Sequence, residues 1–88
     1  MSTYSANANA LFDQMRYSND PQQFSRSIRP LMEVILDAQL AGQPLSRNEC
    51  AAMTHVARGW ANSPVAPGWK QQGGAILVEF FESLFPFG

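Results

Sequence analysis

The chain of 88 residues is expected to form a single helical domain spanning residues 1–88, because this length just allows one apolar core to hold a fold without disulfides or metals. Apolar residues make up 45% of the sequence, which argues against a wholly disordered chain, and a lone cysteine excludes an intramolecular disulfide. Six basic and seven acidic residues give a formal charge of -1, so the basic surplus that neutralises nucleic-acid phosphates is missing.

Targeting and membrane signals are weak. Residues 1–7 contain neither a basic stretch nor a continuous apolar stretch of the kind found in signal peptides. No uninterrupted apolar run is longer than that of residues 75–78, which is far too short to cross a bilayer. These features predict a cytoplasmic protein with no membrane span.

The first predicted helix is marked by apolar residues at helical spacing, namely Tyr4, Ala8, Leu11, Phe12 and Met15. It is expected to stop at residues 18–20, where a second helix starts. Asp20 can accept hydrogen bonds from the free amides of that second helix. Pro21 fits its first position, where a missing N–H has no consequence.

The second predicted helix covers residues 21–41, before the breaker residues Gly42 and Pro44. One broad apolar stripe should face the core: Phe24, Ile28, Leu31, Met32, Ile35 and Leu36. Pro30 lies inside this stretch and cannot donate a backbone hydrogen bond, so we expect the helix to be kinked or split there.

The third predicted helix has a clear start, because residues 46–49 match a capping box and Leu45 is placed to act as its hydrophobic staple. Cys50, Met53, Ala57 and Trp60 then fall on one face, and the helix should end near Asn62. Cys50 is interpreted as a small apolar side chain buried in this helix. Residues 63–68 contain two prolines and a glycine and are expected to form a loop.

The last segment could be a strand over residues 75–81 on propensity alone. No other part of the chain resembles a strand that could pair with it, so a helix over residues 74–85, stopped by Pro86, is preferred. This helix would have two adjacent apolar faces and only a narrow polar stripe made by Glu79, Glu82 and Ser83.

Two apolar faces on one helix have two explanations. The helix is either the buried centre of a bundle, or it packs within its own chain with one face and binds another chain with the second. Because a small protein has much surface relative to its volume, we prefer binding, either to a partner or within a homodimer. The residues expected at the protein interface are Trp69, Ile76, Val78, Phe81, Phe85 and Phe87, with Arg58 and Lys70 as charges at its rim.

Catalytic and metal sites are not indicated. His55 is the only histidine and has no neighbours at metal-ligand spacing, while Glu79 and Glu82 are best explained as solubilising groups. No cofactor is expected. Residues 45–52 resemble the first helix of a helix-turn-helix, yet the helix continues to Trp60 and the following segment is rich in phenylalanine.

The sequence thus predicts an all-α protein, a small bundle of about four helices that is dimeric. Its expected role is that of a non-enzymatic protein-binding module. It would be a small regulator or inhibitor, such as an anti-activator or a virus- or plasmid-type inhibitor, that occludes a partner protein's surface with its apolar C-terminal helix. The alternatives are a small helix-turn-helix-like DNA-binding regulator and a secretion-type chaperone.

Overall fold

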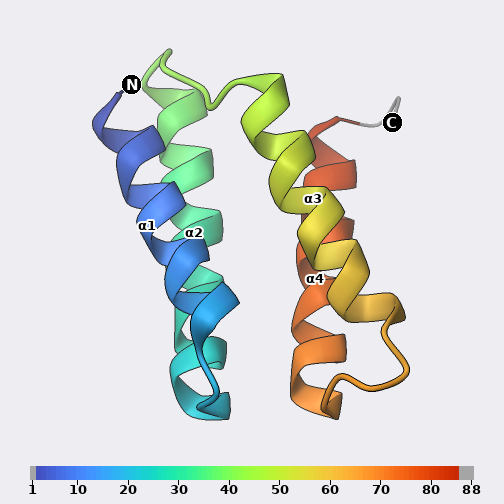
Figure 1. Cartoon of the computed structure of the whole chain (residues 1–88). Coiled ribbons are helices and arrows are strands. Elements are labelled where there is room, and N and C mark those ends of the chain that lie inside the picture. The colour runs from blue at the N-terminus through green and yellow to red at the C-terminus, as the bar shows by residue number, and fades with distance from the viewer. Residues whose placement is uncertain (1, 86–88) are drawn as a thin grey trace. The chain divides into compact units, whose positions relative to one another are not determined.

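Four helices account for nearly all of residues 2–85, which are the residues described by this computed structural model (Figure 1). They are α1 (Thr3–Tyr17), α2 (Pro21–Leu40), α3 (Arg47–Asn62) and α4 (Gly68–Leu84). No strand occurs within the described residues, so the prediction of an all-α fold with about four helices is confirmed. The strand considered for residues 75–81 is excluded, because these residues are helical.

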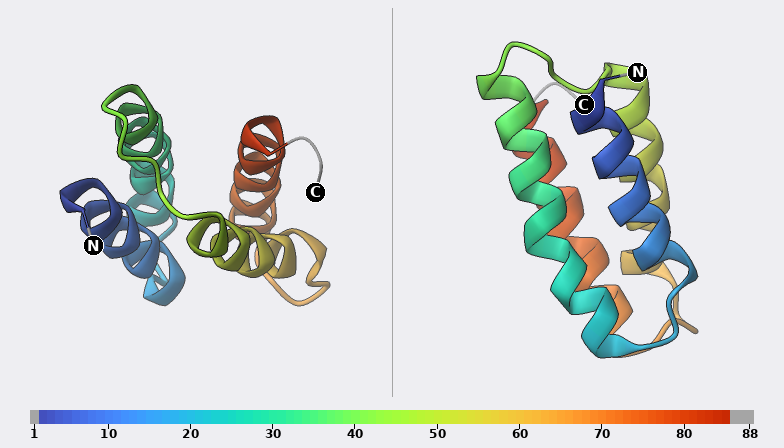
Figure 2. Two further views of the ribbon diagram at one scale, coloured as in Figure 1. Left: turned by 90° about the horizontal axis from the view of Figure 1, so that it is seen from above. Right: turned by 90° about the vertical axis from the view of Figure 1, so that its left-hand side faces the viewer.

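The first hairpin is formed by α1 and α2, which lie side by side (Figures 1 and 2). The predicted cap is present: the Asp20 carboxylate accepts a hydrogen bond of 3.0 Å from the Gln22 amide, and Pro21 follows at the start of α2. The buried Ser18 hydroxyl accepts from the Asp20 amide at 3.1 Å and lies 3.1 Å from Gln23 Oε1. These bonds hold the three-residue turn in one conformation.

The second helix is continuous from Pro21 to Leu40 with Pro30 inside it, so it is not divided into two separate helices; a kink at Pro30 stays a prediction. A glycine follows the end of the helix at Leu40 for a physical reason. Gly42 has a φ of 72°, and the Gln43 amide donates to the Ala38 carbonyl at 2.9 Å. This is the left-handed closing turn that favours glycine after a helix.

The second hairpin is formed by α3 and α4, which approach each other closely at Gly74. A Cβ atom placed on Gly74 would lie 2.5 Å from the Ala57 carbonyl oxygen and 2.8 Å from the Ala61 amide nitrogen. Only a residue without a side chain fits against backbone at these distances. Gly74 is therefore a close packing point between two helices.

The start of α4 differs from the prediction. The helix begins at Gly68, within the segment expected to be a loop, and runs through Gly73 and Gly74 without a break. Pro67 precedes it in an extended conformation, and the amides of Lys70 and Gln71 donate to the Pro67 carbonyl at 3.0 and 3.1 Å. A glycine is needed at position 74 inside the helix because the α3 backbone passes so close.

Residues 2–47 and 48–85 form two compact units, which correspond to the two hairpins. Each hairpin has buried apolar residues of its own: Ala8, Phe12, Met15, Phe24, Leu31, Ile35 and Ala38 in the first, and Cys50, Met53, Ala57, Leu77 and Phe81 in the second. That the whole chain behaves as one domain stays a prediction.

Candidate protein-binding surface

The apolar residues of α4 fall on two faces, and α3 occupies one of them. Gly74, Val78, Phe81 and Phe85 follow one another at spacings of three or four residues and so lie along one side of the helix. Because Gly74 meets the α3 backbone, this side is the one directed at α3. We call it the inner face of α4. Phe81 is only 1% exposed, and Val78 and Phe85 are half-buried.

This placement changes the role of one residue predicted to be at an interface. Phe81 is enclosed within the chain and is not available to a partner, so it is a core residue. Val78 and Phe85 share the inner face and are half-buried, so their place at an interface stays a prediction. Phe87 lies outside the described residues. Periodicity identified the two faces correctly but could not tell which one α3 would cover.

On the second apolar face of α4, side-chain exposure differs from one residue to the next. Leu77 is fully buried, whereas Ile76 on the outward edge is 46% exposed. Trp69 and Phe80 lie near Ile76 at spacings of seven and four residues, and both are half-buried. We call Trp69, Ile76 and Phe80 the outer edge of α4. It includes two of the predicted interface residues.

Phe80 was missed as an interface residue, although its helical spacing from Ile76 could have revealed it. Its ring meets that of Phe81 edge-on, with centroids 5.6 Å apart and an interplanar angle of 65°. This is a favourable aromatic geometry, and it links the outer edge to the buried inner face. One member of the outer edge, Phe80, therefore contacts the core residue Phe81 directly.

The two predicted rim charges both interact across the α3–α4 hairpin. Arg58 Nη2 is 3.1 Å from Glu82 Oε1, and both side chains are more than half exposed. The ammonium group of Lys70 lies 5.3 Å from the centre of the Trp60 ring, a cation–π distance. Exposed pairs of this kind contribute little stability, typically below about 1 kcal/mol each. Their main effect here is to orient side chains on the hairpin surface.

The remaining reactive groups do not form a site. His55 is exposed, and no cluster of three or more potential metal ligands occurs within residues 2–85. Cys50 is buried, which confirms its interpretation as a core side chain. Burial, with a smaller contribution from the charge of Glu49, raises the pKa of the Cys50 thiol to about 11. The thiolate that would act as a nucleophile is therefore scarce at neutral pH.

In the part of the chain described here, no helix has the length and apolar character that crossing a membrane requires. Comparison of the chain with protein-family models, with curated proteins and with solved structures finds no match.

Proposed function

We propose that this protein is a non-enzymatic binding module that uses the outer edge of α4 to cover a surface of another protein. The observation that supports the proposal is the division of α4 into two apolar faces. One face packs on α3 at Gly74, while the other ends in an edge where Ile76 is nearly half exposed between two aromatic residues. Together these three apolar side chains offer a surface that a partner could cover.

The composition of the outer edge favours tight contact over a small area. Trp69 and Phe80 are large side chains with few rotatable bonds, and such aromatic residues dominate the binding energy of many interfaces. Each Å² of apolar surface removed from water contributes about 25 cal/mol, so closing this edge against a partner is favourable. The protein would act by steric occupation, as a regulator or inhibitor in the cytoplasm.

The partner best suited to this edge has an apolar groove with a basic residue at its border. Glu79 is exposed and follows Ile76 by one helical turn, so it would flank a docked partner on the polar side of α4. Charge at the border of an interface mainly guides association and selects the partner. The same reasoning disfavours DNA, because α4 contains two glutamates and a single lysine.

The proposal is tested by placing a negative charge on the outer edge and, as a control, one residue away. Tagged wild-type protein, Ile76→Glu and Ala75→Glu are each used to capture partners from the native source, and the captured protein is identified and its binding measured with purified components. Ala75 is also exposed on α4, so its variant has the same net charge and lies on the same helix.

A partner that binds the wild type and Ala75→Glu but loses at least tenfold affinity for Ile76→Glu would support the proposal. Equal binding by all three proteins, or equal loss in both variants, would show that the outer edge of α4 is not the binding surface.

A further inference from the structure

The outward side of α2 has a row of apolar side chains that the first hairpin leaves partly uncovered. Ile28, Met32, Leu36 and Leu40 are spaced four residues apart and therefore form one ridge along the helix. Exposure increases along the ridge. Ile28 and Met32 are half-buried, Leu36 is 42% exposed and Leu40 is 87% exposed. We call these four residues the α2 ridge.

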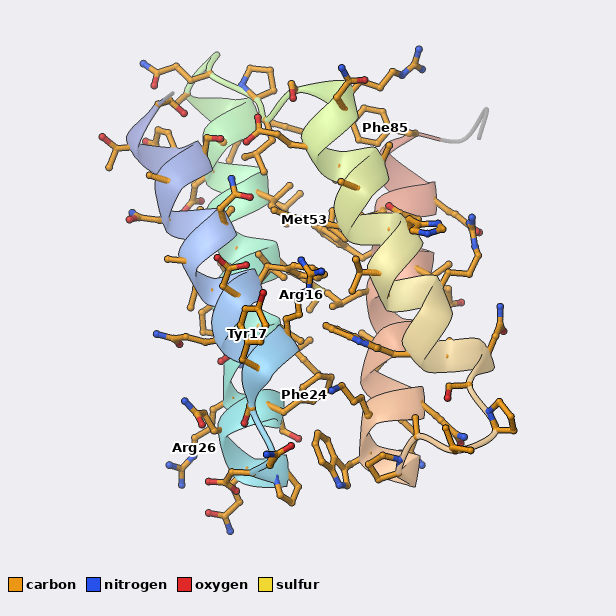
Figure 3. The ribbon with its side chains drawn as sticks, viewed as in Figure 1. Arg16, Tyr17, Phe24, Arg26, Met53 and Phe85 are labelled. Atoms are coloured by element: carbon orange, nitrogen blue, oxygen red, sulfur yellow. The ribbon has the colours of Figure 1, made fainter. Side chains whose placement is uncertain are left out.

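Beside the α2 ridge runs a row of charges that is sorted by sign. Arg26 and Arg29 lie in the N-terminal half of the helix, and Glu33 and Asp37 lie in the C-terminal half. All four side chains are exposed, and Figure 3 shows Arg26 extending outward from α2. None of the four takes part in an ion pair within residues 2–85. Their charges are thus available to a partner.

We propose that a second copy of this chain binds the α2 ridge, with the two α2 helices antiparallel about a two-fold axis near Met32. A helix that is basic in one half and acidic in the other complements itself only when reversed. In that arrangement Arg29 of each copy faces Glu33 of the other, and Arg26 faces Asp37. A parallel two-fold arrangement would place the two charged rows on opposite sides of the contact, where they could not pair with each other.

The charged row sets the register, and Ile28, Met32 and Leu36 fit it, whereas Leu40 falls opposite position 24 and lies outside the paired part of the ridge. With Met32 opposite its own copy, Ile28 falls opposite Leu36. Since an α-helix rises 1.5 Å per residue, the Arg29–Glu33 and Arg26–Asp37 pairs are then offset by only about 3 and 1.5 Å along the axis. Arginine side chains span such offsets easily. A two-fold axis also forms every contact twice.

The size of the face predicts a weak dimer. A helix of 20 residues is about 30 Å long, and one face of it supplies less than the roughly 800 Å² per partner of a standard interface. We therefore expect dissociation in the micromolar range or weaker, and further weakening as salt screens the charges. This contact uses a different helix from the proposed partner-binding edge, so the two proposals stand or fall separately.

The test is sedimentation equilibrium of the full chain over a wide concentration range at low and high salt. Glu33→Arg should weaken the dimer about tenfold, because it replaces two attractions with two repulsions. Adding Arg29→Glu to the same chain should restore it, because the exchanged charges again complement each other. Asp13→Arg, an equal charge change at an exposed position of α1, is the control, and circular dichroism checks that every variant is folded.

Dimerisation that weakens about tenfold in Glu33→Arg, is restored in the double variant and is unchanged in Asp13→Arg would establish the antiparallel contact. A chain that is monomeric at all concentrations would overturn the proposal. Three other results would also overturn the proposal, because each would mean that the dimer uses another surface. These are an equal response to Glu33→Arg and Asp13→Arg, a double variant that does not restore the dimer, and loss of the dimer in Ile76→Glu.

Discussion

Replacing Gly74 with alanine tests the packing of α4 on α3. The added Cβ would lie 2.5 Å from the Ala57 carbonyl oxygen, 2.8 Å from the Ala61 amide nitrogen and 3.0 Å from the Trp60 Cβ. All three separations are inside the roughly 3.5 Å at which nonbonded heavy atoms attract. The first two atoms are partners in one backbone hydrogen bond of α3, so no side chain can rotate away to make room. The helices must separate, by about 1 Å.

The expected change in the free energy of unfolding of Gly74→Ala is the sum of two opposing effects. Overpacking against rigid neighbours costs about 3 kcal/mol, and the higher helix propensity of alanine returns about 1 kcal/mol. Gly74→Ala should therefore lower the free energy of unfolding by about 2 kcal/mol and Tm by roughly 10 °C.

Gly59→Ala is the matched control for this substitution. It makes the same chemical change inside α3, at an exposed position where an added Cβ meets nothing within 4 Å. It should raise the free energy of unfolding by about 0.5 kcal/mol. Urea unfolding followed by circular dichroism measures both variants. If Gly74→Ala were as stable as Gly59→Ala, the close approach of α3 and α4 would be wrong.

Three further predictions concern single side chains. Leu31→Ala should cost about 2–5 kcal/mol in urea unfolding because Leu31 is fully buried, whereas the same change at the exposed Leu40 should cost less than about 0.5 kcal/mol. Asp20→Ala removes the cap on the Gln22 amide and should lower unfolding free energy by about 1 kcal/mol; an unchanged value would mean that water replaces the cap. Burial raises the pKa of the Cys50 thiol from 9.0 to about 11, so its stabilising contribution is complete below pH 9 and lost as the pH rises to 11. The difference in Tm between wild type and Cys50→Ala should therefore shrink over that range, and a constant difference would contradict it.

The extent of α4 shows what a sequence pattern can and cannot predict. The cap at Asp20 and the end of α3 at Asn62 depend on neighbours along the chain, so local signals located them well. The sequence predicts that the last helix begins at about Gly74, whereas α4 begins six residues earlier, at Gly68. The need for a glycine at position 74 comes from the backbone of α3, which is a tertiary contact and leaves no local signal.

The exposed ridge of α2 was missed for a similar reason. Leu36 was grouped with the core-facing stripe because its spacing fits that stripe, and Leu40 was not assigned a role. In the structure Leu31 and Ile35 are buried, while Leu36 and Leu40, on the neighbouring ridge, stay exposed. Periodicity shows that a helix has a wide apolar face, but the position of the neighbouring helix decides which part of that face is covered.

The most direct measurement of the central claim, that α4 has one face for folding and one for binding, compares a glutamate on each face. Thermal unfolding followed by circular dichroism should leave Ile76→Glu within about 5 °C of the wild-type Tm, because nearly half of that side chain is already in water. Phe81→Glu, which places a charge where the side chain is 1% exposed, should abolish cooperative unfolding. If Ile76→Glu unfolded like Phe81→Glu, the outer edge of α4 would be core, and the proposed binding surface would not exist.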